Sequence, residues 1–574
     1  MSNGLPGLPT DATVDRRAFL ERMTALTATA ALTPVALVSS RPGPAAAGDT
    51  PALRSELPKA GMIQATEPAD LTVVEAAQLI RERDLSAEEL VQSCLDRIDR
   101  WDGDYRAFNL VLDEEALASA RRTAAAPGGA RTPLAGVPLA IKDNFYTAGV
   151  PTTANSYLFE DFVPAFDATA WARLRDAGAI LLGKTQMGPL ATTAATTPDG
   201  ERTTVNAWSP FDDDVSPGGS SSGTATSVAA RMAACGTGTQ TGGSITNPSN
   251  AQGLTGIKPT MGRVSLQGIL PLTYTRDHVG PLARDARDAA LMLQIMAGPD
   301  AADPRSLGLP PVPDYVAATE PPRGSRELRW PTRIGVWPGY LDDPTPPPAR
   351  DREQQQGDRV GSTPPRAERG QEAFARRQVE VEARREMLTT LEAMGAELIE
   401  IDEPSHWSTL TGWPFNNVRL PERSEIFLEH LRRDVRGFGV SLSPWINGLL
   451  LPGAEYVRGQ RARLVLLKSI LDDVFSRCDV VVQTAPFPFD MVGLPLIAFP
   501  IGFEAASTAG PRPIGALFGG LPYAEDRLLA LAAGYQRATD WHRRQPAEPD
   551  SFERPPSGRR RSRIDAMDVM ELAE

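Results

Sequence analysis

The chain has 574 residues, and its hydrophobic content of 41% is ordinary for a globular protein that buries a sizeable core. Acidic residues outnumber basic ones by 72 to 59, which argues against a general nucleic-acid binder, a class that usually carries a basic excess. The three cysteines form no C-x-x-C pair and the four histidines are scattered, so the sequence predicts buried thiols and no metal site.

The N-terminus predicts an export signal over residues 1–47. Arg16 and Arg17 precede an uncharged stretch, 23–40, and a run of alanines follows it. This order is typical of a secretory signal, and the paired arginines resemble a bacterial twin-arginine signal. An ordinary amphipathic helix is the alternative. From this pattern we expect an exported protein, periplasmic or extracellular. Because the uncharged stretch is short and rich in Ala and Thr, we expect no stable membrane span after signal removal.

Residues 60–548 are expected to form one domain in which helices alternate with strands. Apolar spacing predicts two helices within 61–102, and Ser86 with Glu89 forms a capping-box pattern for the second one. Further predicted elements are a strand at 106–112, a helix at 113–125, a strand at 136–145, a helix and strand at 168–185, a helix at 283–298 and a strand at 333–339. This alternation predicts an α/β protein.

Two stretches lack the apolar residues that a core requires. Residues 342–372 are predicted to form a low-complexity surface insertion, and residues 549–574 a disordered charged tail. Between them we expect a helix and strand at 381–402 with Gly395 as the helix C-cap, strands at 478–486 and 494–503, and a helix at 525–541. The small-residue stretch 209–259 is given no secondary structure.

Two short motifs match well-known catalytic patterns without the required context. Residues 178–185 fit G-x-x-x-x-G-K-[ST], but their variable positions are Ala-Ile-Leu-Leu and look like the strand itself. Residues 219–223 fit G-x-S-x-G around Ser221, but the preceding residues are acidic and turn-like instead of a buried strand. Nucleotide binding and Ser-His-Asp catalysis are therefore the disfavoured alternatives.

A lysine is the candidate base for any serine chemistry here. A serine hydroxyl is a weak nucleophile, and Lys142 ends the apolar run 137–141, where burial would lower its pKa and keep the amine neutral. The equally open alternative is a lysine that snorkels from a strand end to water.

Three blocks of sequence resemble the amidase signature family: "GVPLAIKDN", "SPGGSSSGTATSVAA" and "GTGTQTGGSITNPSNAQGLTGIKPTMGRVS". Their order and gaps fit, and the resemblance extends from about Leu71 to His542. It implies the amidase signature fold, a mixed β-sheet core flanked by helices on both faces.

The resemblance also implies a Ser–Ser–Lys triad without metal or organic cofactor. It makes Ser244 the nucleophile, Ser220 a bridging serine after a cis peptide bond, and Lys142 the base. It further implies an oxyanion hole built from the backbone amides of Thr241, Gly242 and Gly243.

The sequence departs from the family pattern T-D-T-G-G-S-I-R at two positions beside the nucleophile. Gln240 replaces the aspartate and Thr246 replaces the arginine. We read this as the paired loss of a supporting ion pair, which puts the rigidity of the nucleophile loop in doubt. Gln186 and Pro189 also differ from the family pattern, so the chain is a divergent member.

The expected activity is hydrolysis of a carboxamide in a small-molecule substrate, with no nucleic-acid partner. Two alternatives stay open: an ammonia-generating amidotransferase subunit, and a catalytically silent binding protein on the same scaffold. The sequence predicts no particular oligomeric state, and a homodimer is one option. Phe145, Tyr146, Tyr157 and Trp413 are candidates for an acyl pocket, each equally well explained as core.

Overall fold

The computed structural model describes residues 63, 65–125, 131–322, 325–346, 366–504 and 510–554. The predicted export signal lies outside these residues, as do most of the predicted insertion and the tail beyond Arg554. Within the described part, no helix has the length and apolar character needed to cross a membrane.

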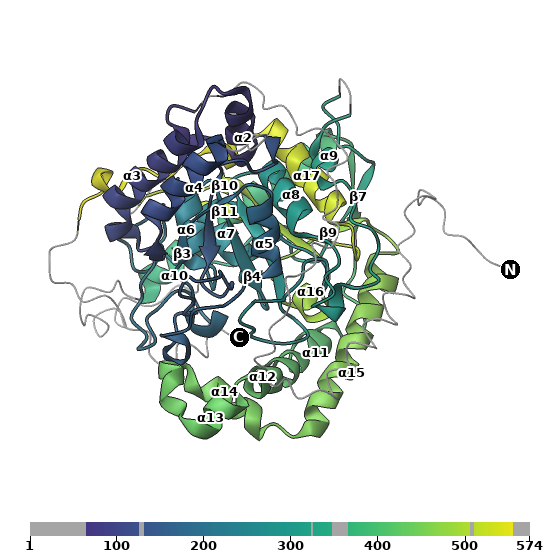
Figure 1. The fold of residues 1–574 in the computed structure, drawn as a ribbon. Helices are drawn as coiled ribbons and strands as arrows, with labels where there is room; N and C mark the ends of the chain where they lie inside the picture. Colours follow the sequence, from purple (N-terminus) through teal and green to yellow (C-terminus); the bar gives the residue numbers. More distant parts are fainter. Residues whose placement is uncertain are drawn as a thin grey trace.

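An 11-stranded mixed sheet forms the centre of the molecule, with helices around it (Figure 1). The strands are β1 Phe108–Val111, β2 Pro138–Lys142, β3 Ile180–Thr185, β4 Cys235–Gln240, β5 Thr255–Lys258, β6 His278–Ala283, β7 Thr332–Val336, β8 Ala396–Glu400, β9 Val480–Val482, β10 Leu496–Phe503 and β11 Pro513–Gly520. Their order is β1-β3-β2-β4-β6-β5-β10-β11-β9-β7-β8. β2 pairs in parallel with β3 and β4, and β7 with β8 and β9, whereas the other pairs are antiparallel. The predicted α/β class and mixed sheet are confirmed.

The helices that follow the apolar spacing lie close to their predicted positions. They are α2 Val73–Glu82, α3 Ala87–Tyr105, α4 Asp113–Ala125, α5 Thr169–Asp176, α8 Ala286–Met296 and α17 Glu525–Ala538. α10 Arg366–Ala393 includes its predicted range but begins earlier, and the short α9 Tyr315–Thr319 lies in a Pro-rich passage where no helix was predicted. α3 begins at the predicted capping box of Ser86 and Glu89, and α2 has an equivalent box at Thr72 and Glu75. These reciprocal bonds satisfy N–H groups that a helix start leaves unpaired.

The small-residue stretch that had no predicted structure supplies the middle of the sheet. It forms α6 Ser222–Ala229, β4, α7 Thr246–Gln252 and β5, and every residue of β4 is buried. Small side chains let α6 pack closely on β4, and the buried hydroxyls find partners: Thr224 Oγ1 donates to Thr237 O at 3.1 Å. Burial by neighbouring elements, and not apolar character, makes this segment regular.

A second group of helices packs at one end of the molecule (Figure 1). These helices are α11 Trp407–Thr411, α12 Pro414–Ile426, α13 Leu428–Arg433, α14 Leu442–Leu450 and α15 Gly453–Ser469, and α15 contacts the short helix α16 Phe487–Val492 in the body of the molecule. Of these, α12 and α16 bring aromatic rings to the candidate site described below.

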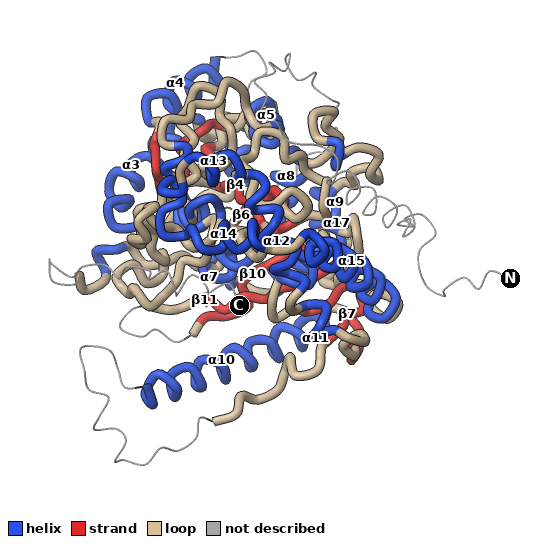
Figure 2. Tube along the Cα trace, turned by 90° about the horizontal axis from the view of Figure 1, so that it is seen from below, coloured by secondary structure: helices blue, strands red, loops and turns tan. Residues whose placement is uncertain are grey.

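Two predicted boundaries differ from the structure. α10 begins at Arg366, inside the predicted 342–372 insertion, because the residues after it are mostly good helix formers (Figure 2). At the other end, the described chain continues to Arg554, past the predicted boundary at 548, and Arg554 Nη2 lies 2.9 Å from Asp104 Oδ2 on α3.

Candidate active site

Lys142 lies at the end of β2, fully buried, with its side-chain nitrogen surrounded by oxygens. Its Nζ lies 2.8 Å from Ser220 Oγ, 2.9 Å from Ser221 Oγ and 2.9 Å from Thr239 Oγ1. All of these are uncharged oxygens. Complete burial excludes the snorkelling alternative, since the amine does not reach water.

Burial lowers the pKa of Lys142 well below its ordinary value of 10.5, and the charge of Asp277 offsets only part of this shift. Desolvation disfavours the ammonium form, and hydroxyl groups stabilise it less than a carboxylate would. The expectation that burial would lower this pKa is confirmed. A lysine in this state can accept a proton from a neighbouring hydroxyl.

Ser220 and Ser221 both lie beside Lys142, and Ser221 connects it to the segment that carries Ser244. The Gly219–Ser220 peptide bond is cis, as the resemblance implies. Ser221 Oγ lies near Lys142 Nζ and donates to the main-chain oxygen of Ser244 at 2.6 Å. Within the described residues no hydrogen bond joins Ser220 directly to Ser244, which is 8% exposed. The structure therefore brings the three predicted residues into one cluster, and Ser221 is a fourth member that the resemblance did not assign.

The predicted oxyanion residues lie in the nucleophile loop, residues 240–246. Thr241 is held on both sides, because its Oγ1 donates to Asp277 Oδ1 and its carbonyl accepts from Arg276 Nη2 at 2.7 Å. Gly243 has a φ of +95°, a conformation that favours glycine, and a Cβ there would lie 2.4 Å from the Asn247 side chain. The loop can keep this shape only with glycine at that position.

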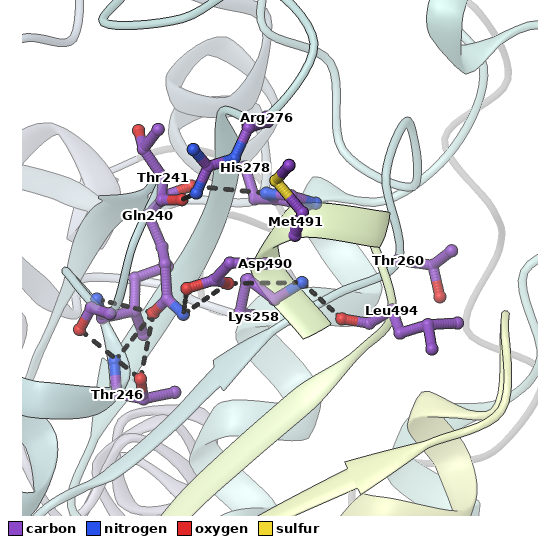
Figure 3. A network of polar contacts seen from close by, with 12 residues as sticks. Gln240, Thr241, Thr246, Lys258, Thr260, Arg276, His278, Asp490, Met491 and Leu494 are labelled. Atoms are coloured by element: carbon purple, nitrogen blue, oxygen red, sulfur yellow. Dashed lines mark hydrogen bonds and ion pairs between the residues drawn. The ribbon is translucent and has the colours of Figure 1, made fainter. Parts of the chain in front are cut away.

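Gln240 fixes the nucleophile loop through its side-chain amide (Figure 3). Its Oε1 accepts from the backbone N–H groups of Ile245 and Thr246, both at 2.9 Å, and from Thr246 Oγ1 at 3.2 Å. Its Nε2 donates to Asp490 at 2.8 and 3.1 Å. The question left open at positions 240 and 246 therefore has a structural answer in these bonds, since an amide accepts as a carboxylate does and also donates.

Two aromatic rings that the sequence analysis did not single out cover the nucleophile loop. A Cβ on Gly242 would lie 3.2 Å from the ring of Phe487 and 3.5 Å from that of Phe415. No local pattern distinguishes these residues, because α12 and α16 reach the loop only in the folded chain. Of the four predicted pocket residues, Phe145 is buried in the core and Tyr146 packs edge-on against Phe162 and Phe166, whereas Tyr157 and Trp413 are 44% and 40% exposed.

The two disfavoured motifs have other roles. Residues 180–185 of the first motif form β3, and Lys184 is a buried partner of Asp143 at 3.1 Å, so the segment is the strand itself. Ser221 of the second motif contacts Lys142 and Ser244. The buried His278 contacts Gln240 O through Nδ1 at 3.3 Å, and burial lowers its pKa well below the ordinary value.

The chain is similar to several known proteins in sequence and in fold. A protein-family model described as Amidase matches residues 89–356. The chain is similar to a glutamyl-tRNA(Gln) amidotransferase subunit from Chromohalobacter salexigens, with 34% identity over 526 residues that cover 83% of this chain and 98% of that protein. The corresponding subunit from Nitrosococcus oceani is 32% identical, with 83% and 99% covered. The structure is also similar to that of the native peptide amidase from Stenotrophomonas maltophilia, with a TM-score of 0.65, 26% identity, and 85% and 99% of the two chains covered.

Proposed function

The chain belongs to the amidase family, and from this membership we propose that it hydrolyses a carboxamide C–N bond through an acyl-enzyme on Ser244. The observation that supports this proposal most is the fully buried Lys142, whose amine lies 2.8 Å from Ser220 Oγ and whose pKa burial lowers. The products are a carboxylic acid and ammonia or an amine.

The reaction begins when the hydroxyl oxygen of Ser244 attacks the carbonyl carbon of the amide. The Ser244 proton passes to Ser220, whose own proton passes to Lys142, so the charge that forms on Lys142 balances the oxyanion. Backbone amides of Thr241, Gly242 and Gly243 are the proposed donors to that oxyanion, and their fixed orientation avoids reorganisation in the transition state. When the C–N bond breaks, Ser220 returns a proton to the leaving nitrogen and recovers one from Lys142. Water then attacks the Ser244 ester and passes its proton through Ser220 to Lys142, and when the ester bond breaks the same relay returns a proton to the Ser244 oxygen and the acid is released.

A panel of amides tests this proposal. Purified protein would be offered glutamine, aliphatic amides, aryl amides and peptide amides, together with esters and carbamates, and release of ammonia, amine or alcohol would be measured. We expect turnover of at least one amide by wild type, and loss of about 1,000-fold or more in kcat for Ser244→Ala. Equal turnover by wild type and Ser244→Ala would rule out the mechanism.

A second candidate is an amidotransferase subunit that produces ammonia for a partner protein. The curated relatives reported above bear this name and are covered over nearly their full length, which supports this candidate better than a free-standing amidase. The chemistry at Ser244 is the same in both, with glutamine as the donor amide. Copurification of the untagged protein from its native cells discriminates: a stable partner whose addition accelerates glutamine hydrolysis favours the amidotransferase role, and a chain active alone on other amides favours the amidase.

Export of the protein is a further proposal, based on the twin-arginine pattern before residue 47. It bears on the choice above, because a subunit that acts with charged tRNA works in the cytoplasm. Cell fractionation with an antibody to the folded domain measures it, and conversion of Arg16 and Arg17 to lysine should retain the protein inside the cell.

The catalytically silent alternative predicts no reaction of Ser244 with a fluorophosphonate probe.

A further inference from the structure

Asp490 is a buried carboxylate that the proposed mechanism does not use, although it lies directly beneath the nucleophile loop. It comes from α16, and both of its oxygens accept from Gln240 Nε2. Lys258 Nζ lies 3.8 Å from the same carboxylate. Lys258 is held in turn by the carbonyl of Leu494 (Figure 3). The carboxylate therefore joins the nucleophile loop to α16 and to the end of β5.

The hydrogen bonds allow only one orientation of the Gln240 amide. The N–H groups of Ile245 and Thr246 can only donate, so they require Oε1, and the Asp490 carboxylate can only accept, so it requires Nε2. A carboxylate at position 240 would satisfy the first pair but would face a second carboxylate at about hydrogen-bond distance. All four groups are buried, so water does not relieve such a conflict.

We propose that Asp490 is a positioning residue for Ser244 that acts through Gln240, so that residues 240 and 490 work as a matched amide–carboxylate pair. The pair connects the nucleophile loop to α16: Gln240 accepts from the amides at 245 and 246 and donates to Asp490. This inference rests on the proposed nucleophilic role of Ser244. In this chain the amide–carboxylate pair would support the nucleophile loop in place of the aspartate and arginine of the family pattern.

The test is a double-mutant cycle read by the rate of fluorophosphonate labelling of Ser244 and by kcat and KM on the best substrate. Gln240→Glu removes the Nε2 donor and sets two carboxylates against each other. We expect the labelling rate and kcat to fall about 10- to 100-fold, with KM changed by less than about threefold, because the loop carries the reacting groups. Asp490→Asn should also slow labelling, since it removes the counter-ion of Lys258.

The decisive variant is the swap Gln240→Glu with Asp490→Asn. The introduced asparagine amide can donate to the introduced glutamate, which can still accept from the amides at 245 and 246, so one complete set of donors and acceptors is restored. We expect this double variant to react about tenfold faster than Gln240→Glu alone. Gln536→Glu is the matched control: Gln536 is a buried amide on α17 that accepts from Ala286 N and donates to Thr255 Oγ1, and its replacement should lower stability without changing the labelling rate of folded protein.

A Gln240→Glu variant that is labelled within about twofold of wild type, or a swap no faster than the single variant, would overturn the inference while leaving the proposed function intact. Absence of label on wild-type Ser244 would overturn the proposed function, and the inference with it. If Gln240→Glu does not fold, Gln240→Met carries the test. It removes the bonds of both Oε1 and Nε2 without adding charge, and its labelling rate should fall to a similar extent.

Discussion

Two buried lysines at strand ends, Lys142 on β2 and Lys258 on β5, show how the surroundings decide what one side chain does. Both are fully buried, and burial lowers the pKa of both. Lys258 has Asp490 3.8 Å away, which partly offsets that shift and leaves its pKa at about 8. Lys142 has only hydroxyl and carbonyl oxygens within hydrogen-bond distance among the described residues. The carboxylate of Asp490 therefore keeps Lys258 a structural cation, whereas the uncharged surroundings of Lys142 prepare it to act as a base.

The largest expected effect comes from Lys142→Met. This change removes the base, so we expect kcat to fall about 1,000-fold or more, as for other residues of a catalytic unit. No carboxylate is left without a partner, and the desolvation that lowers the pKa of Lys142 is removed, so the free energy of unfolding at about pH 7 should be no lower than that of wild type. Steady-state kinetics and urea unfolding measure the two quantities. A variant that keeps activity, or one that fails to fold, would break the contrast with Lys258.

The corresponding change at the other lysine, Lys258→Met, should act mainly on stability. It leaves the buried Asp490 without its cation, which we expect to cost about 3–5 kcal/mol in the free energy of unfolding. Combining it with Asp490→Asn removes the stranded charge and should recover part of that loss. Equal stability of Lys258→Met and wild type in urea unfolding would show that the ion pair contributes nothing.

The pH dependence of the free energy of unfolding tests the lowered pKa of each lysine. Between its lowered folded pKa and 10.5, Lys142 is neutral when folded and protonated when unfolded, so the unfolded state binds one more proton. Stability contributed by this group therefore rises with pH in that window, and Lys142→Met should reduce the slope by about 1.4 kcal/mol per pH unit. Lys258 gives the same sign, but only from about pH 8 to 10.5. Unfolding curves at about pH 7 and about pH 9 measure this: the gain in stability between the two pH values should be smaller in Lys142→Met than in wild type, and an unchanged gain would contradict the lowered pKa.

The smallest expected effect concerns Ser221, which contacts Lys142 Nζ and donates to Ser244 O. Ser221→Ala removes both contacts and leaves Ser220 and Thr239 in place. We expect kcat to fall about tenfold, with KM nearly unchanged, because the change loosens the reacting groups without removing one. Wild-type kcat in this variant would show that Ser221 is only a packing residue.

Much of the fold follows from apolar spacing, whereas its centre does not. α4 matches the predicted range of 113–125, and β2, β3 and β10 lie inside predicted strands, because their buried faces are built from apolar side chains. β4 is equally buried but consists of Cys, Gly, Thr and Gln. Its burial comes from the elements around it, so a pattern within the strand could not reveal it.

The candidate site divides in the same way. Lys142, Ser220 and Ser244 follow from the family resemblance, and the structure places them in one cluster. Asp490 lies 250 positions from Gln240 in sequence, and no local signal connects the two. The loss of charge at positions 240 and 246 left the support of the loop in doubt, and the bonds of the Gln240 amide become visible only once its partners in the folded chain are known.

The central claim, that neutral Lys142 activates Ser244, is tested most directly by mass spectrometry after reaction with a fluorophosphonate. Wild type and Lys142→Met would be treated in parallel, and the modified peptide identified over a time course. We predict an adduct on Ser244 in wild type, with a labelling rate at least about 100-fold lower in Lys142→Met. An adduct on another residue, or equal rates in the two proteins, would contradict the claim.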